Sequence, residues 1–198
     1  MIFLDFDGTL VDLWPRYYAV FCDLTKLNNV SLSEYRHTKQ KLIKDSLVAE
    51  YFGQKLSSDY FEKKRIMLEE KKYLSLDKLF FEKEEIQCLL KKNCIILSKR
   101  RNRNNFYWQL DNLGIKCNAY VVENKLEWIQ AHASNENHII IGDSVDDLRI
   151  GILPNITAWM VGYGVNVKEQ FRDIDHRFFS CPSDLLTALK EEINKIAI

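Results

Sequence analysis

Carboxylates gather at two points of this 198-residue chain, each directly after a short apolar run. Asp5 and Asp7 follow the apolar residues 1–4, and Asp143 follows residues 139–141. Alternate residues of a strand share a face, so Asp5 and Asp7 should project the same way if the strand continues through them. Carboxylates at a strand end are costly unless positive charge joins them, and a hard divalent cation with oxygen ligands is the natural candidate.

The second cluster is the denser one. Asp143, Asp146 and Asp147 lie within five residues, and they repel one another unless a cation or a lysine compensates. We expect Asp143 to share a metal ion with Asp5. Asp147 is expected to act on that metal through water or to hold Lys125. Asp146 is more simply read as a solvated or helix-capping residue.

Two single residues follow other apolar runs. Ser98 comes after residues 94–97, and Lys125 stands at a predicted helix start. The Ser98 hydroxyl could bind a phosphoryl oxygen, although either residue alone is a weak signal. A lysine at a helix N-terminus is unfavourable for the helix dipole, which points to a neighbouring anion. Lys99 and Arg100 come next after Ser98 and could form a basic rim for an anionic substrate, or simply a solvated face.

Strands and helices alternate from residue 82 onward. Strands are predicted over residues 94–97, 118–122, 138–141 and 158–161, with a short one at Phe178 and Phe179. Helices are predicted over residues 83–92, 104–113, 126–133, 148–153 and 183–196. This alternation predicts an α/β fold with a doubly wound parallel sheet. Because sites in such sheets form beyond the carboxyl ends of the strands, the carboxylates, Ser98 and Lys125 should converge there.

Residues 13–81 predict a small helical bundle without a strand, inserted between the first two strands of the sheet. Pro15 suits the first turn of one helix. Ser31 and Glu34 have the spacing of a capping box for a second helix, and a third is predicted over residues 57–74. The expected apolar positions are Ile43, Leu47 and Tyr51 in the second helix, which Gly53 ends, and Phe61 and Leu68 in the third.

The composition restricts the function further. Lys plus Arg and Asp plus Glu both total 28, so no overall field attracts nucleic acid. No apolar run approaches the roughly 18 residues of a membrane helix, and no secretory segment is recognised. The 5 Cys are scattered without a Cys-x-x-Cys pair, which favours reduced thiols over disulfides or a zinc site. We expect a soluble, cytoplasmic protein; its oligomeric state stays open.

The order of these residues resembles the four motifs of the haloacid-dehalogenase-like (HAD) phosphohydrolase superfamily. The residues that carry the resemblance are Asp5-Phe6-Asp7-Gly8-Thr9, Ser98, Lys125 and Gly142-Asp143-Ser144-x-x-Asp147. Ser98-Lys99-Arg100 and Gly162-Tyr163-Gly164 are similar to stretches of phosphoglycolate-phosphatase-like members. The resemblance implies a Rossmann-like catalytic core, residues 1–12 and 82–198, with an inserted α-helical cap, residues 13–81.

The resemblance also implies a reaction. Asp5 would attack the phosphorus of a small phosphomonoester and form an aspartyl phosphate, with Asp7 as general acid and base. Asp5, Asp143 and the main-chain carbonyl of Asp7 would hold Mg²⁺, and Ser98 and Lys125 would stabilise the phosphoryl oxygens. Supporting roles fall to Gly8, Thr9, Gly142, Ser144 and Asp147.

Two other classes stay open on the same resemblance. The chain could be a phosphomutase or phosphotransferase acting on sugar phosphates, or a non-catalytic regulatory protein. Dehalogenation is disfavoured, since dehalogenases of this superfamily generally lack the second Asp that Asp7 supplies.

Overall fold

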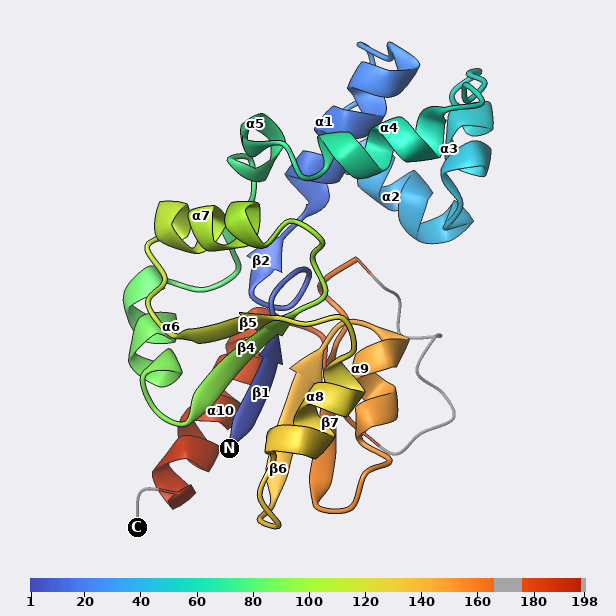
Figure 1. Cartoon of the computed structure of the whole chain (residues 1–198). Helices are drawn as coiled ribbons and strands as arrows, with labels where there is room; N and C mark the ends of the chain where they lie inside the picture. Colours follow the sequence, from blue (N-terminus) through green and yellow to red (C-terminus); the bar gives the residue numbers. More distant parts are fainter. Residues whose placement is uncertain (166–175, 197–198) are drawn as a thin grey trace. The chain divides into compact units, whose positions relative to one another are not determined.

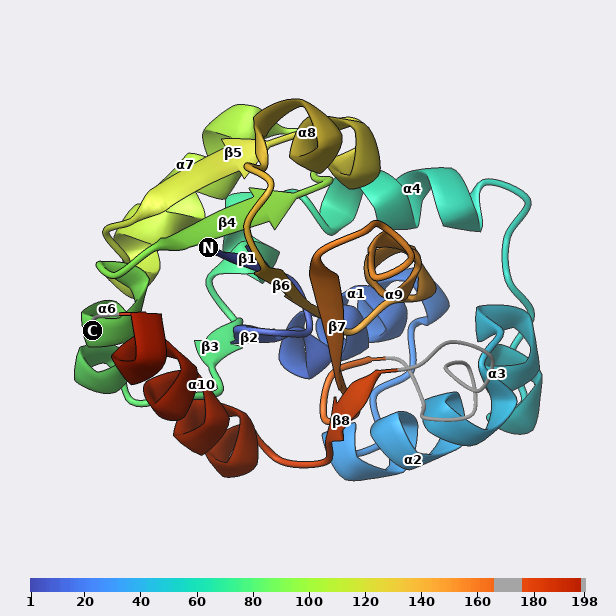
Figure 2. The same cartoon turned by 90° about the horizontal axis from the view of Figure 1, so that it is seen from below.

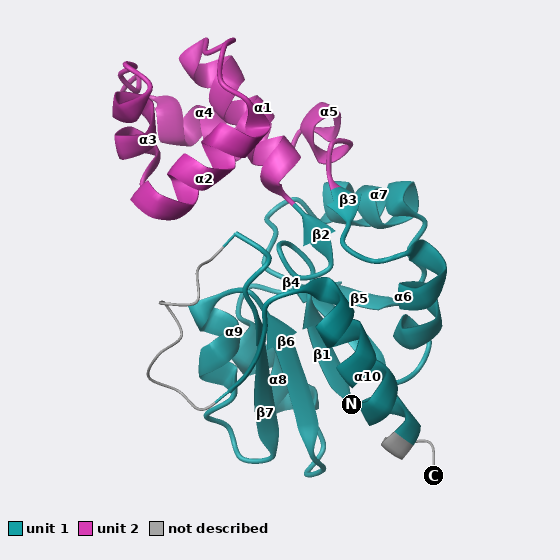
Figure 3. Cartoon of the chain, turned by 180° about the vertical axis from the view of Figure 1, so that it is seen from behind, with its two compact units in different colours: residues 1–12, 78–198 teal, residues 13–77 magenta. Residues whose placement is uncertain are grey.

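The computed structural model describes residues 1–165 and 176–196, and the chain divides into two compact units (Figure 3). The core unit comprises Met1–Asp12 and Lys78–Ile198, and the helical unit comprises Leu13–Asp77. The second boundary lies a few residues before the predicted residue 81. The reason is a two-stranded sheet that belongs to the core, in which β2 (Val11–Asp12) pairs antiparallel with β3 (Lys78–Leu79). The expectation that residues 13–81 contain no strand was therefore wrong at β3.

A six-stranded sheet forms the centre of the core unit, with the strand order β5-β4-β1-β6-β7-β8 and parallel pairing throughout (Figures 1 and 2). Its strands are β1 (Ile2–Asp5), β4 (Cys94–Ser98), β5 (Asn118–Val121), β6 (His138–Gly142), β7 (Ile156–Val161) and β8 (Arg177–Phe179). Ile2, Phe3 and Leu4 are buried, as expected of a central parallel strand covered on both faces. The predicted α/β fold with a parallel sheet is confirmed.

Helices cover both faces of this sheet, as the doubly wound prediction requires (Figures 1 and 2). Helix α9 (Val145–Ile150) packs on β6 and β7 and contacts α8 (Lys125–His132). On the other face, α6 (Lys83–Leu90) contacts β4 and packs against α10 (Pro182–Ile196). Helix α7 (Arg103–Leu113) connects β4 to β5 and ends at Gly114, whose φ of 68° makes it the predicted C-cap.

The helical unit contains α1 (Trp14–Thr25), α2 (Leu32–Leu42), α3 (Asp45–Tyr51), α4 (Tyr60–Met67) and α5 (Lys71–Leu74). The capping box is present: the Ser31 Oγ accepts from the Glu34 N–H at 3.2 Å, and a Glu34 carboxylate oxygen accepts from the Ser31 N–H at 2.8 Å. The predicted second helix is nevertheless broken at Ile43, whose φ is 61°. The predicted third helix is likewise divided into α4 and α5.

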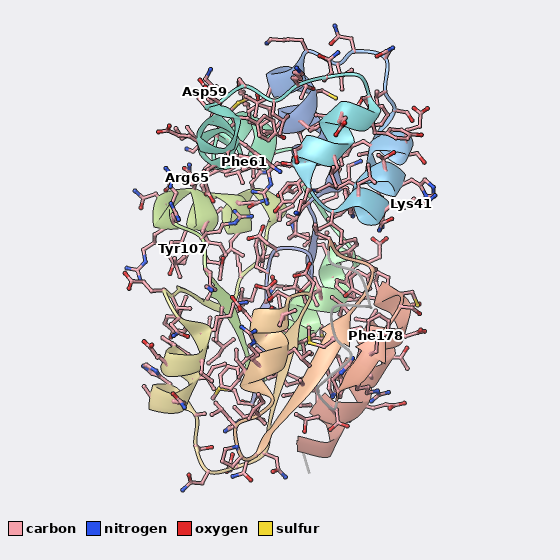
Figure 4. The ribbon with its side chains drawn as sticks, turned by 90° about the vertical axis from the view of Figure 1, so that its right-hand side faces the viewer. Lys41, Asp59, Phe61, Arg65, Tyr107 and Phe178 are labelled. Carbon is pink, nitrogen blue, oxygen red and sulfur yellow. The ribbon has the colours of Figure 1, made fainter. Side chains whose placement is uncertain are left out.

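These breaks shift the buried face of the helices. Tyr51 is 68% exposed and Phe61 is 64% exposed, although both were expected on a buried face. Figure 4 labels Phe61 on α4. Tyr60, the neighbour of Phe61, is buried instead, and its hydroxyl donates to the buried Asp45 at 3.1 Å. The aromatic core of this unit consists of Trp14, Phe21, Tyr35, Tyr60 and Tyr73.

No helix in the described residues is both long and apolar enough to span a membrane.

Candidate active site

Strand β1 brings Asp5 to the carboxyl edge of the sheet. Asp5 stands opposite Leu97 of β4, and Leu4 stands opposite Ile141 of β6, so the residues that follow all three strands meet at this edge. The chain then turns sharply at Gly8, where φ is 81°, and the Gly8 N–H donates to the Val11 carbonyl at 3.0 Å. A glycine suits this turn because residues with a Cβ rarely adopt such a φ.

Lys125 is the cation of the site. It is buried in the first turn of α8, and its Nζ donates to Asp5 Oδ1 at 2.5 Å and to Asp147 Oδ1 at 2.7 Å. Burial alone would lower the pKa of the Lys125 ammonium, but the carboxylates of Asp147 and Asp5 outweigh it and raise that pKa above its ordinary value. The anion that the helix position of Lys125 indicated is therefore a pair of the protein's own carboxylates.

Asp147 is fixed by its own helix as well as by Lys125. Ser144 is the N-cap of α9; its Oγ accepts from the Asp147 N–H at 3.3 Å and donates to Asp147 Oδ2 at 2.5 Å. A Cβ added at Gly142 would overlap the Asp147 carboxylate, which explains a glycine immediately before Asp143. Asp143 itself accepts the Val165 N–H at 3.2 Å.

The carboxylates at this edge are short of positive charge. Burial raises the pKa of Asp5 well above its ordinary value, and Lys125 opposes this shift while Asp147 and Asp143 add to it. The pKa of Asp143 is raised to about 7, mainly by burial and secondly by the repulsion of the Asp147 carboxylate. One lysine thus faces three buried carboxylates, so a further cation would stabilise their ionised forms.

These residues fit a hard divalent cation. Asp5, Asp143 and Asp147 each offer a carboxylate oxygen, and these oxygens lie within 4.8 Å of one another. Oxygen ligands of this kind are what Mg²⁺ and Ca²⁺ prefer. Asp147 joins the group through its carboxylate, whereas the contribution predicted for Asp7, through its main-chain carbonyl, stays a prediction.

The side chain of Asp7 takes a different direction and is held by Arg100. Arg100 Nε donates to Asp7 Oδ2 at 2.6 Å, and a second contact joins Arg100 Nη2 to Asp7 Oδ1. Arg100 Nη1 donates to Gln109 of α7. Arg100 is only 8% exposed. Its place on a substrate rim stays a prediction. No sequence pattern pointed to Gln109.

The remaining predicted residues lie around this edge. Thr9 Oγ1 donates to Asp5 Oδ2 at 3.3 Å. Ser98 is buried at the end of β4, where its Oγ accepts from the Arg100 N–H at 3.3 Å. Lys99 is exposed and pairs at 2.8 Å with Asp146, which lies on the surface as expected.

Comparison with known proteins identifies the fold. No family model and no curated protein matches the chain. Among solved structures, a haloacid-dehalogenase-like hydrolase from Streptococcus pneumoniae shares 19% identity at a TM-score of 0.61, covering 94% of this chain and 96% of its own. A predicted phosphoglycolate phosphatase from Haemophilus somnus shares 15% at 0.62, with coverages of 95% and 96%.

A third similar structure is Protein Tyrosine Kinase A of Mycobacterium tuberculosis, with 16% identity, a TM-score of 0.61 and coverages of 95% and 96%. The likeness to all three extends over nearly the whole of both chains in each comparison. At these identities it establishes the fold and leaves the reaction to be argued from the site. The chain therefore has the haloacid-dehalogenase-like fold, built on a Rossmann-like core.

Proposed function

We propose that the protein is a Mg²⁺-dependent phosphatase that hydrolyses a small phosphomonoester through an aspartyl phosphate on Asp5. The observation that carries this proposal is the contact of Lys125 with Asp5 at the carboxyl edge of the sheet, beside the buried oxygens of Asp143 and Asp147. A nucleophilic carboxylate, a fixed ammonium and a cation-binding acid cluster are together what attack on phosphorus requires.

The chain's own residues account for both chemical steps. Asp5 forms a bond to phosphorus while the bond from phosphorus to the leaving oxygen breaks, and Asp7 gives that oxygen a proton. Asp7 then takes a proton from a water, whose oxygen attacks the phosphorus and restores the free Asp5 carboxylate. Lys125 and Thr9 orient the two Asp5 oxygens, since one donates to Oδ1 and the other to Oδ2.

The charge of the phosphoryl group is stabilised by groups already in place. Lys125 is buried beside Asp5, and Ser98 is buried at the end of the adjacent strand β4. Fixed donors in a site that excludes water stabilise developing charge with little reorganisation. When held by Asp5 and Asp143, with Asp147 close by, Mg²⁺ would supply further positive charge against the phosphate.

The helical unit, residues 13–77, is proposed as the cap. Its division from the core as a separate compact unit supports this role. Such units close over substrates, exclude water and select the substrate.

A phosphotransferase or phosphomutase is the second candidate, because one structure of this fold is that of a protein tyrosine kinase. The same Asp5 chemistry would serve, with a substrate hydroxyl in place of water. A non-catalytic protein is less well supported, since Asp5, Asp7, Lys125 and Asp143 are all present.

A panel of small phosphomonoesters, assayed with Mg²⁺ and with excess chelator, tests the proposal. We expect phosphate release that needs Mg²⁺ and that is lost in Asp143→Asn. Asp146→Asn is the matched control, because Asp146 lies in the same acidic segment but on the surface. Turnover that continues in excess chelator would refute the proposal. Transfer of label to sugar hydroxyls rather than water would favour the second candidate.

A further inference from the structure

Three side chains from separate segments of the core unit form a connected polar chain that ends on Asp7. Arg100 follows β4, Gln109 lies on α7, and Asp7 follows β1. The Arg100 guanidinium contacts both Asp7 oxygens and directs its third nitrogen to Gln109 Oε1. A guanidinium that binds both oxygens of a carboxylate fixes the orientation of that carboxylate, which a single contact does not.

Arg100 is itself held on several sides. Its Cζ lies 5.3 Å from the centre of the Phe6 ring and 5.9 Å from that of the Phe106 ring. Gln109, whose Oε1 accepts a hydrogen bond from Arg100 Nη1, is fully buried. A planar guanidinium enclosed in this way loses little further freedom when it binds a carboxylate. Residues of α7 therefore determine the direction of the Asp7 carboxylate by holding Arg100.

This arrangement matters for a group that transfers protons. Asp7 lies directly before the turn at Gly8, two residues after Asp5, and the turn alone does not fix its side chain. A general acid and base acts only within hydrogen-bond reach of the reacting oxygen. The loop that carries Arg100 also carries Ser98, and the Arg100 N–H donates to the Ser98 Oγ. One loop thus fixes both the residue expected to hold phosphate and the carboxylate expected to move the proton.

We propose that Arg100 is a positioning residue for Asp7, anchored by Gln109, and not a ligand of the substrate. This inference rests on the proposed function, because it assigns Asp7 to proton transfer.

A double-mutant cycle tests it. The proteins are wild type, Arg100→Lys, Asp7→Asn and the double variant, compared on an ester whose leaving oxygen needs a proton. Lysine keeps the charge but not the two-point contact. Arg100→Lys should lower kcat by roughly 100-fold, the scale of a misplaced reacting group, with little change in KM. In the Asp7→Asn background the same change should have little further effect, because the carboxylate that it positions is absent.

Two outcomes would overturn the inference. An equal loss of kcat in both backgrounds would show that Arg100 acts independently of Asp7. A raised KM with unchanged kcat would show that it binds the substrate. Arg101→Lys is the matched control, since Arg101 is the next residue and exposed, and it should leave both constants unchanged.

A second readout needs no activity and covers a variant that folds poorly. Urea midpoints of the same four proteins should be non-additive, and Gln109→Leu should lower kcat in the wild-type background only. Additive midpoint shifts would refute the contact between Arg100 and Asp7 itself. If the wild type hydrolyses no phosphomonoester, both the proposed function and the role of Arg100 in proton transfer are refuted. Non-additive midpoints would then locate the failure in the function and not in the pairing.

Discussion

Replacement of Asp143 by asparagine should make the metal-free protein more stable at alkaline pH. Burial and then Asp147 raise the Asp143 pKa from its ordinary 3.8 to about 7. An acid with a raised pKa in the folded state stabilises the fold below its unfolded pKa, and that stability is lost as the pH rises through the folded pKa. Each pKa unit corresponds to about 1.4 kcal/mol, so at pH 8 the ionised carboxylate opposes folding by up to about 4 kcal/mol.

Asparagine removes that charge and keeps an oxygen that can accept the Val165 N–H. We therefore expect Asp143→Asn to raise the free energy of unfolding at pH 8 by a few kcal/mol, up to the bound of about 4 kcal/mol. At pH 5 the gain should shrink to about 1.5 kcal/mol, because the folded wild type is then already protonated. With Mg²⁺ at pH 8 the wild type should become the more stable protein. The ion stabilises the folded wild type, whereas the variant lacks one of its ligands.

Urea unfolding at pH 5 and pH 8, each with chelator and with Mg²⁺, measures the free energy of unfolding of both proteins under these four conditions. Asp146→Asn controls for the loss of a surface carboxylate from the same segment, and it should respond to Mg²⁺ as the wild type does. An Asp143→Asn protein that is less stable than the wild type at pH 8 in chelator would refute the destabilising charge of Asp143. An undiminished Mg²⁺ response in that variant would equally remove Asp143 from the metal site.

Three further predictions concern neighbouring residues. Asp5→Asn should abolish both turnover and covalent phosphoryl labelling. Asp7→Asn should slow hydrolysis by roughly 100-fold or more and accumulate phosphoryl label from an activated ester. Intact-mass measurement after rapid quench distinguishes the two variants, and label on Asp5→Asn would reverse the assignment of nucleophile and acid. Lys125→Met leaves buried carboxylates without their cation and should lower the free energy of unfolding by about 3–5 kcal/mol at pH 8. The loss should be smaller at pH 5, and urea titrations that find the same loss at both pH values would contradict this prediction. Gly8→Ala forces a side chain into a φ of 81° and against the Asp143 carboxylate, so calorimetry should find Mg²⁺ binding weakened, and unchanged affinity would argue against that contact.

The sheet and the convergence of the site could be predicted because one pattern repeats along the chain. Asp5, Ser98 and Asp143 each come at or directly after the end of a buried apolar strand, and parallel strands end at the same edge. Apolar runs reveal such strands without any knowledge of the tertiary structure. Holding Lys125 was one of the two roles anticipated for Asp147, since clustered carboxylates repel one another unless a cation or a lysine compensates.

The partner of Asp7 could not be predicted in the same way. Arg100 stands in a basic, polar segment typical of a solvated loop. Its burial depends on Phe6, which is distant in sequence, and on Phe106 and Gln109 of the helix that follows. The break at Ile43 was equally hidden, because a positive φ at a β-branched residue has no local sequence signal. That break reset the helical phase, so a pattern read continuously across it assigned the wrong side to the residues that follow.

The small β2–β3 sheet makes the helical unit a modular insertion. Asp12 pairs with Lys78 and Val11 with Leu79, and the Phe80 N–H donates to the Leu10 carbonyl at 3.0 Å. The chain therefore leaves the core and re-enters it at neighbouring points, about 5 Å apart for paired antiparallel residues. A two-residue hairpin turn spans that gap. Residues 13–77 can thus be exchanged for a turn or for another domain without redesign of the sheet, since every such replacement would join the core at the same β2–β3 junction.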